Sequence, residues 1–506
     1  MISIKEHCAR SNAQYIVNGQ PEGAKPQIPE YTEVLHYPEL TCDEVKILFE
    51  KAKEDAIKNQ ASYISNPAVD FTRNRTWTFT RTVDTILSLG KESVQSGLDN
   101  STDMSDNKLR GNAFCMARQK ISHNAFQDMM SGFSKSAPSP TYKGFNPLGM
   151  DGSVLDIPTN RSEMATYHSN KKTDGGYNQL FVNGRVNLMD KTIKEAMVTA
   201  MSKKDERTAA AAIISGDDHG EPNINILDRG YEGYDLFITI IEKGEHFVCR
   251  VKEHDSNGIL SGIELPQTPE FDTTHVFFLT RSQAKEMKEV EGYKLVPASQ
   301  KIGRLETATD FYALKLRIVR IEVAPGKYET LVTDLLEEAT GFTVKDLKYL
   351  YYLRWNHEVT YKLVKYVAGL IHLHSYFLEN ILQEVYATIF MYNVSRLTAN
   401  CIDIGNGNTP VVSQKEYEEV CEAIEKRAEE AAKGVEIDWT KPVEVSFEKW
   451  WVNFSLAYGN IKRWLYGEGN ARELCKRVNL NKVKYRPGRN FKRNVRPQHA
   501  RHAFYC

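Results

Sequence analysis

The most informative stretch of the chain reads Tyr351-Tyr352-Leu353-Arg354-Trp355-Asn356-His357-Glu358-Val359-Thr360-Tyr361-Lys362-Leu363-Val364-Lys365. Neither proline nor glycine interrupts it, and its pattern predicts one helix from about Val344 to Ala368. At about 100° per residue, an arc of about 60° holds four polar side chains, those of Tyr351, Arg354, Glu358 and Lys365. Apolar residues occupy much of the opposite side, where they can pack on a core. One helix face therefore displays a carboxylate among two cations and a phenol.

A solvent-exposed ladder of ion pairs is the simplest explanation of this face. Arg354 and Glu358, and likewise Glu358 and Lys362, are spaced four residues apart. Each such pair contributes about 0.2–0.5 kcal/mol on an exposed helix. Taken alone, the helix therefore favours a structural role, and the rest of the chain has to decide.

The whole-chain composition is that of an ordinary soluble protein with room for two to four domains. The 506 residues are 41% hydrophobic and 26% charged, with a formal net charge of -1. The C-terminal end differs, because residues 471–506 hold eleven Lys or Arg and a single acid, Glu473. Such a basic segment with interleaved aromatics predicts contact with nucleic acid, and the candidate DNA-binding residues here are Lys482, Lys484, Arg486, Arg489, Lys492 and Arg493.

Several classes of protein are disfavoured. The eight cysteines are scattered without a C-x-x-C pair, which argues against a zinc knuckle or a disulfide framework. No phosphate-binding G-x-x-x-x-G-K-[ST] motif occurs, so we expect no nucleotide cofactor. The N-terminus lacks the apolar core of a signal peptide, and no apolar run is long enough to cross a membrane. We therefore expect a cytoplasmic protein with no membrane association.

Changes in composition divide the chain into five predicted segments. Residues 1–140 form a helical N-terminal domain that plausibly binds DNA, although a packing domain with solvated cations fits equally well. A Ser/Pro/Gly-rich boundary follows. Residues 146–235 and 335–400 form the two parts of an α/β domain with a mixed sheet, residues 236–334 form a β-rich insertion between them, and residues 401–506 form a helical region with the basic tail.

The expected helices outside the opening stretch are Cys42–Ala61, Thr82–Gly90, Arg110–Met130, Lys204–Ser215, His374–Thr398, Ser413–Lys433 and a Trp-rich segment with Trp450, Trp451 and Trp464. The expected strands of the α/β domain are Leu148–Pro158, Asn178–Val182, Arg185–Met189 and Asn223–Asp228. Asn183-Gly184 is predicted to join the middle two as a hairpin turn. The insertion is predicted to begin with a strand at Leu236–Ile241. The acidic region 416–448 should repel DNA and pack on protein.

Three carboxylates occupy places where acids are costly unless they are used. Asp151 lies in the first strand of the α/β domain, Asp228 lies at the carboxyl end of another strand, and Glu358 lies on the opening helix. Open α/β sheets place their ligands at the carboxyl ends of strands. Carboxylates without His or Cys partners suit hard cations such as Mg²⁺ or Mn²⁺, and two such ions can cleave a phosphodiester.

Alternatives remain open for each acid. Asp151 can cap a turn beside Gly152, and Asp228 can cap a helix or pair with Arg229. Asp156 is a rival to Asp151, but it lies five residues on and points to the other face of a strand. If the three acids do converge, Arg354, Lys362 and Lys365 would face phosphates.

The spacing Tyr351-x2-Arg354-x3-Glu358-x6-Lys365 matches the Y-(2)-R-(3)-E-(6)-K signature of a large group of bacterial DDE transposases, the insertion-sequence-four family. Asp151-Gly152-Ser153 resembles the first-aspartate strand of that family, and Asp228-Arg229-Gly230-Tyr231 resembles its second-aspartate motif. A β-rich insertion before the glutamate is also typical of the group. The resemblance covers residues 148–370.

This resemblance implies a ribonuclease H-like core with Asp151, Asp228 and Glu358 as a catalytic triad that binds two Mg²⁺ or Mn²⁺ ions. It implies cleavage at the terminal inverted repeats of an insertion sequence and transfer of the freed 3′-hydroxyls into double-stranded target DNA, by a cut-and-paste route. Tyr351, Arg354 and Lys365 would contact the DNA backbone, with Lys362 and Arg229 as further candidates. A homodimer on DNA and a nucleoid-associated, bacterial location are expected. The alternatives are a catalytically silent derivative and a structure-selective nuclease on the same fold.

Overall fold

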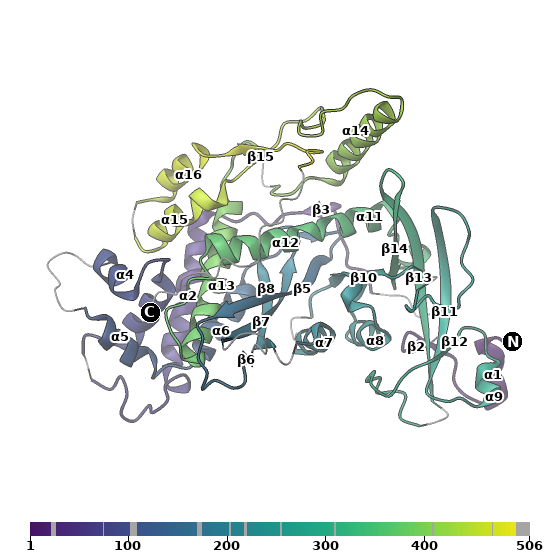
Figure 1. Cartoon of the computed structure of the whole chain (residues 1–506), viewed down its shortest axis with the longest axis horizontal. Coiled ribbons are helices and arrows are strands. Elements are labelled where there is room, and N and C mark those ends of the chain that lie inside the picture. The colour runs from purple at the N-terminus through teal and green to yellow at the C-terminus, as the bar shows by residue number, and fades with distance from the viewer. Residues whose placement is uncertain are drawn as a thin grey trace. The chain divides into compact units, whose positions relative to one another are not determined.

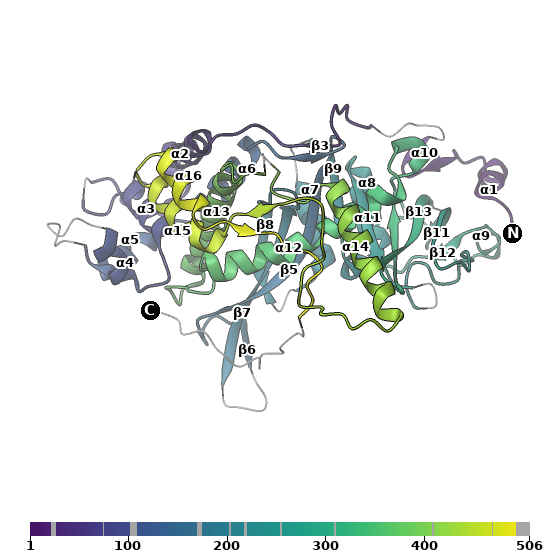
Figure 2. The ribbon, with the colours of Figure 1, turned by 90° about the horizontal axis from the view of Figure 1, so that it is seen from above.

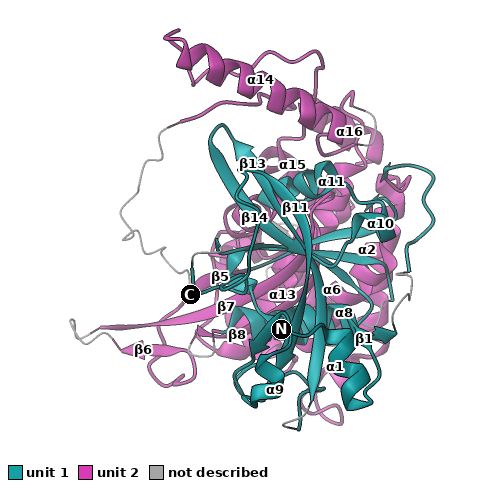
Figure 3. Ribbon diagram, turned by 90° about the vertical axis from the view of Figure 1, so that its right-hand side faces the viewer, with its two compact units in different colours: residues 1–36, 141–151, 205–355 teal, residues 37–140, 152–204, 356–506 magenta. Residues whose placement is uncertain are grey.

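The computed structural model describes residues 1–21, 27–73, 75–101, 109–169, 175–201, 204–216, 220–253, 256–307, 310–406, 409–467 and 469–491. These residues form two compact units, coloured separately in Figure 3. Unit 1 comprises residues 1–36, 141–151 and 205–355, and unit 2 comprises residues 37–140, 152–204 and 356–506. Strand β5 (Asn146–Ile157) is shared, because its first half belongs to unit 1 and its second half to unit 2. The predicted segment boundaries stay predictions.

Unit 1 is a mixed sheet with strand order β12-β11-β13-β14-β10-β9-β5. Strands β5, β9 and β10 run parallel, whereas β10, β14, β13 and β11 pair antiparallel. The strand bounds are β9 Asn223–Leu227, β10 His246–Val251, β11 Phe271–Thr280, β12 Tyr293–Leu295, β13 Phe311–Ala324 and β14 Lys327–Thr333, with the short strands β1 Ile16–Val17, β2 Gln20–Pro21, β3 Leu35–His36 and β4 Thr141–Tyr142.

Helices cover both faces of the unit 1 sheet. Figure 1 shows α7 (Glu206–Gly216) and α8 (Tyr234–Glu242) on one side and α11 (Val344–Leu353) on the other. The remaining helices of this unit are short: α1 Ile4–Ser11, α9 Lys285–Lys288 and α10 Glu337–Thr340. Helix α11 begins at a capping box, in which the Thr343 side chain accepts from the Asp346 N–H and the Asp346 carboxylate accepts in return. Leu350 and Leu353 are buried as predicted.

Unit 2 is built around one long buried helix, α13 (Leu378–Asn400). Four helices pack against it: α2 Cys42–Lys58, α3 Phe79–Ser88, α6 Asn124–Ser136 and α15 Phe454–Leu465. The other helices of this unit are α4 Val94–Ser101, α5 Gly111–Arg118, α14 Gln414–Ala432 and α16 Ala471–Asn479. The second half of β5 neighbours β7 (Gly176–Asn187), which pairs with β8 (Ile193–Ala200) and, at its start, with β6 (Tyr167–Ser169), as Figure 2 shows. Trp450–Trp451 (β15) pairs with Val483–Lys484 (β16).

The sequence predicted most of these elements. The helix expected over residues 344–368 is present as three consecutive segments: α11, then α12 (Trp355–Lys362), then a π-helical turn at Leu363–Val367. The helices expected near Cys42, Lys204, His374 and Ser413 and the strands expected near Leu148 and Asn223 are also confirmed. No described helix is long and apolar enough to span a membrane.

The predicted hairpin turn at Asn183-Gly184 is wrong. Strand β7 runs through both residues, which pair with Met197 and Ala196 of β8, and the chain turns instead after Asn187. Asn183 is 1% exposed, whereas a turn dipeptide would face solvent. The glycine serves a close approach, because a Cβ at Gly184 would lie 3.0 Å from the Tyr361 hydroxyl oxygen.

Three other expectations are also corrected. The apolar run Leu236–Ile241 lies in helix α8 rather than a strand. A short apolar run shows neither the helical nor the strand period clearly, so periodicity alone cannot tell the two apart. The helix expected over Arg110–Met130 is two helices, α5 and α6, separated by a turn. Trp450 and Trp451 form strand β15 instead of a helix, while Trp464 does lie on a helix, α15.

A buried polar network joins helix α5 to α13 in unit 2. Arg118, which is fully buried, donates from Nε to Gln383, from Nη1 to Glu384 at 2.8 Å and from Nη2 to the backbone oxygen of Asn380. Glu384 also pairs with His374 Nδ1 at 3.0 Å. Every terminal nitrogen of the guanidinium therefore has an acceptor, which is what a buried cation requires.

We predict that Arg118→Met lowers the free energy of unfolding by about 3–5 kcal/mol, because it leaves the Glu384 carboxylate buried without its main cation. The matched control is Lys58→Met, which removes an exposed pair with Glu54 and should cost under about 0.5 kcal/mol. Urea denaturation measures both. Equal losses in the two variants would contradict the assignment of Arg118 as the polar centre of this core.

Candidate active site

The two aspartates of the predicted site share one level of the unit 1 sheet. In the parallel ladder of β5 and β9, Gly149 lies opposite Ile226. Continued by two residues, this register sets Asp151, in the middle of β5, opposite Asp228, which directly follows the last residue of β9. Opposite residues of parallel strands project to the same face. The sheet therefore offers two carboxylates side by side at the edge where such sheets bind ligands.

Asp228 lies between two guanidinium groups of unit 1. Arg250 at the end of β10 contacts Oδ1 of Asp228 at 2.6 Å, and Arg354 approaches Oδ2 at 3.6 Å. Oδ1 also accepts the backbone N–H of Arg229 at 2.7 Å and caps the short 3₁₀ turn that follows. The predicted capping role of Asp228 is thus confirmed, whereas its cation is Arg250 and the Arg229 side chain is exposed.

Tyr351 of helix α11 also belongs to the group of residues around Asp228. It is 8% exposed, and Arg354 stacks on its ring with 5.5 Å between the guanidinium carbon and the ring centroid. Burial raises the pKa of Tyr351 above its usual value; the carboxylates of Glu329 and Asp228 act in the same direction, and the two guanidinium groups oppose them. The phenol is therefore protonated at neutral pH and available as a hydrogen-bond donor.

Sequence analysis missed two members of this group, Arg250 and Glu329. Arg250 Nη1 contacts Glu329 Oε1 of β14 at 2.7 Å, so one guanidinium links Asp228 with a second acid. Burial lowers the pKa of Arg250, but its net shift is upward, because the phenolate form of Tyr351, which exists only at high pH, and the Glu329 and Asp228 carboxylates outweigh the burial. The signal that could have found Arg250 is its place in β10, where Cys249 pairs with Leu227 and the next residue falls opposite Asp228.

The other predicted site residues of the helix belong to unit 2, where α12 is fixed to strand β7 and the turn after it. The Asn356 amide donates to the backbone oxygen of Leu188, and the Tyr361 hydroxyl donates to that of Val182. Glu358 lies half-buried on this helix, and Lys362 is exposed.

Lys365 is held in the π-helical turn that follows α12. Its Nζ donates to the backbone oxygen of Val154, and burial lowers its pKa against the opposing charge of Asp156. Asp156, the rival to Asp151, accepts from the Gln179 amide at 2.7 Å on an exposed edge.

Several cations of the basic tail have partners within unit 2. Lys482 donates to the backbone oxygen of Ile404 and lies over the Trp450 ring, Lys484 pairs with Glu448, and Arg489 donates to the backbone oxygen of Thr440. Arg486 is exposed. Lys492 and Arg493 lie outside the described residues.

Within the described ranges, no group of three or more His, Cys, Asp or Glu side chains is placed to hold a metal ion. Asp151 and Asp228 belong to unit 1 and Glu358 to unit 2, so the metal-binding triad stays a prediction. The donors themselves fit a hard divalent cation, because Asp151 and Asp228 present oxygen ligands at one level of the sheet. A cation there would compete with Arg250 for the same carboxylate.

Residues 147–394 match a family model described as the transposase DDE domain. The match supports a DDE transposase. It includes Asp151, Asp228 and the whole helical stretch from Val344 to Lys365. Enzymes of this family cleave DNA, transfer strands and generally use divalent metal ions. The match does not reach the finer assignment to the insertion-sequence-four family.

Among solved structures, the chain is similar to a piggyBac transposase in a synaptic complex with hairpin DNA. The identity is 11%, the alignment covers 86% of this chain and 75% of the other, and the TM-score is 0.33. A TM-score this low carries no argument about fold or function. The comparison with curated proteins gave no match.

We predict that Arg250→Met lowers the free energy of unfolding by about 1–3 kcal/mol, because two partly buried carboxylates, Asp228 and Glu329, lose their shared partner. Arg320→Met is the matched control on strand β13 of the same sheet, since Arg320 makes a 3.7 Å pair with Glu253 and lies over the Tyr328 ring, and it should cost less than about 1 kcal/mol.

The double variant Arg250→Met, Glu329→Met should recover part of the loss, because one uncompensated acid is removed with the cation. Urea denaturation of the four proteins provides the comparison. An Arg250→Met loss no larger than that of Arg320→Met would count against the electrostatic role of Arg250.

Proposed function

We propose that this chain is a metal-dependent transposase of the insertion-sequence-four family. It would bind the terminal inverted repeats of an insertion sequence, cleave there and join the freed 3′-hydroxyls to target DNA. The observation that carries the proposal is that adjacent parallel strands set Asp151 of β5 opposite Asp228 at the carboxyl end of β9, inside the segment that matches the transposase DDE domain.

A ribonuclease H-like core is part of this proposal. Through the shared strand β5, the strand order is β8-β7-β5-β9-β10. Strands β7 and β8 pair antiparallel, and β5, β9 and β10 pair parallel. In chain order this is 3-2-1-4-5, the arrangement expected of that core, with the first aspartate on the central first strand and the second aspartate after the fourth.

We assign Asp151, Asp228 and Glu358 as the ligands of Mg²⁺ or Mn²⁺, with two ions per site. When bound, such ions activate the attacking oxygen and stabilise the leaving oxygen of a phosphodiester. Arg250 would hold the Asp228 carboxylate in a fixed orientation at the end of β9. In that position the carboxylate faces the sheet edge where the scissile phosphate would lie.

The surrounding side chains suit a DNA backbone. Tyr351 would donate its retained proton to a phosphate oxygen, and Arg354, stacked on that ring, would add a fixed positive charge beside it. Lys362 and Arg229, both exposed, are free to reach phosphates further along the strand. Lys365 would contribute a cation whose charge is costly to bury without an anion.

The basic tail is assigned a lesser part in DNA binding, because Lys482, Lys484 and Arg489 are engaged within the protein. Action as a homodimer on paired DNA ends, a cut-and-paste route and a cytoplasmic, nucleoid-associated location complete the proposal. A structure-selective nuclease and a catalytically silent derivative are the competing functions, and the following experiment separates all three.

The purified protein is incubated with a duplex carrying the inverted repeat that flanks its gene, with and without Mg²⁺, and the products are resolved on a sequencing gel. We expect cuts at the repeat end that require the metal, followed by joined products when target DNA is added. Asp151→Ala, Asp228→Ala and Glu358→Gln should each lower the cleavage rate by at least about a thousandfold, since each removes a metal-bound oxygen.

Asp156→Asn is the matched control, because it removes an acid from the same strand that lies on an exposed edge, and it should retain the wild-type rate. Cleavage without joining would favour a nuclease, and no cleavage by the wild-type protein would favour a silent derivative. Full activity of Glu358→Gln would overturn the assignment of the third metal ligand.

A further inference from the structure

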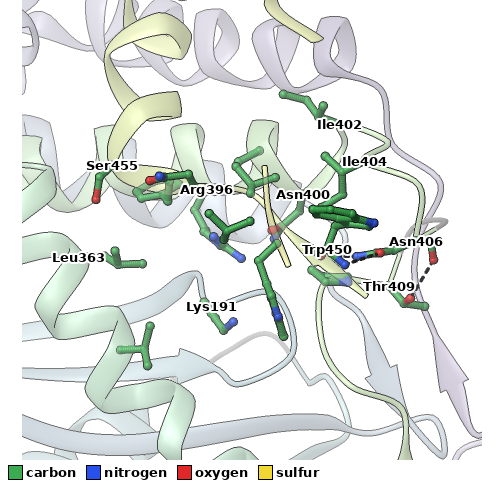
Figure 4. A pocket seen from close by; sticks show the side chains of 18 residues that line it. Lys191, Leu363, Arg396, Asn400, Ile402, Ile404, Asn406, Thr409, Trp450 and Ser455 are labelled. Carbon is green, nitrogen blue, oxygen red and sulfur yellow. Dashed lines mark hydrogen bonds between the residues drawn. The ribbon is translucent and has the colours of Figure 1, made fainter. Parts of the chain in front are cut away.

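A pocket of about 370 Å³ opens in unit 2, beside the helix α12 that carries Glu358. Figure 4 shows its lining, which comes from the turn between β7 and β8, from α12 and the turn after it, from helix α13 and the loop that follows it, and from β15 with the start of α15. Two cations, Lys191 and Arg396, line it together with three aromatic residues, Trp450, Trp451 and Phe454. None of its described lining residues is acidic. This volume lies in the range of small-molecule sites.

Lys191 is the unusual member of this lining. It is only 6% exposed, and among the described residues no carboxylate lies within ion-pair distance of its Nζ. Its ammonium instead lies 4.9 Å from the centre of the Trp451 ring. The residue also has a left-handed backbone, with φ at +65°, which a residue with a Cβ adopts at a cost. Lys191 therefore combines a strained backbone with a buried cation that has no carboxylate partner. This combination indicates a binding function.

The turn that carries Lys191 is held firmly by helix α13. The Tyr392 hydroxyl donates to the backbone oxygen of Lys191 at 2.9 Å, and Arg396 Nε and the Asn400 amide both donate to that of Asp190. Asp190 itself accepts from the Thr192 N–H and hydroxyl. The ammonium of Lys191 is therefore presented to the pocket by a turn whose backbone groups are already bonded, which is how a binding site is pre-organised.

The backbone that carries the aromatic residues is also held in place. The Asn406 side chain accepts from the backbone N–H of Trp450 at 2.8 Å and donates to its backbone oxygen, and β15 pairs with β16. Fixed indole rings are good stacking surfaces for nucleobases. Val483 of β16 also lines the pocket.

We propose that this pocket binds one nucleotide, with the phosphate beside Lys191 and Arg396 and the base against the indole of Trp450 or Trp451. The nucleotide chemistry follows from the pairing of buried cations with fixed aromatic faces in one acid-free cavity. Its identification with a nucleotide displaced from DNA rests on the proposed function. A free nucleotide would have the same chemistry, and the experiment has an arm for each source.

Burial and the nearby Arg396 lower the pKa of Lys191 to about 7, with Asp190 opposing them. An anion bound beside the ammonium would favour its charged form. Without an anion beside it, the Lys191 side chain is therefore partly neutral near pH 7. A bound anion would keep this side chain charged. This behaviour agrees with an anion site and is supported by the geometry described above.

The test uses the full-length protein in EDTA, so that no cleavage can occur, and follows the fluorescence of 2-aminopurine, which falls when the base stacks. Three probes are compared: a short duplex with one unopposed 2-aminopurine nucleotide, the same duplex with that base paired, and free 2-aminopurine deoxyribonucleoside monophosphate. We expect quenching and tight binding with the unopposed nucleotide. Lys191→Met and Trp451→Leu should each weaken this binding by about tenfold or more.

Lys433→Met, on the exposed end of α14, is the matched control and should leave the affinity unchanged. Thermal unfolding verifies that each variant is folded, and Trp451→Phe should restore most of the affinity lost in Trp451→Leu. Quenching by the unopposed duplex alone assigns the site to displaced DNA, and equal quenching by the monophosphate assigns it to a free nucleotide.

Equal affinities of wild type, Lys191→Met and Trp451→Leu for all three probes would overturn the proposal. This outcome is independent of the cleavage assay. A protein that fails to cleave DNA can still show Lys191-dependent quenching, and an active transposase can lack it.

Discussion

The parallel register of β5, β9 and β10 is the constraint on which the site depends. Because the three strands run in one direction with constant offsets, their register brings Asp151, Asp228 and Arg250 to one level. A shift of one residue in either ladder would turn one of these side chains to the opposite face. The ion pair of 2.6 Å between Arg250 and Asp228 is thus a consequence of strand pairing rather than of local sequence.

The helical stretch from Val344 to Val367 contributes residues to both units. Its first segment buries Leu350 and Leu353 and brings Tyr351 and Arg354 to Asp228 within unit 1. Its second segment is fixed to β7 in unit 2 by Asn356 and Tyr361, and carries Glu358. A proline-free and glycine-free sequence favours helix formation in both segments.

Much of this could be predicted because the signals are local. Helix periodicity, the carboxyl-terminal acid of β9 and the spacing of Tyr351, Arg354 and Glu358 are all visible in short windows of sequence. What could not be predicted depends on distant partners. Its dipeptide places Gly184 in a turn, but the glycine instead leaves space for the distant Tyr361. The role of Arg250 depends on the pairing of β10 with β9, which brings it to Asp228. The cavity beside Lys191 likewise depends on a turn, a helix and a strand that are far apart in the chain.

The central claim is that Asp151, Asp228 and Glu358 share divalent cations, and iron-directed backbone cleavage tests it most directly. Fe²⁺ replaces Mg²⁺ in the DNA-bound protein, and ascorbate with peroxide then generates radicals that cut the chain near the ion. The account predicts cuts close to all three acids, suppressed together by excess Mg²⁺ and lost together in Asp228→Ala. Cuts near Asp151 and Asp228 that persist without any cut near Glu358 would contradict it.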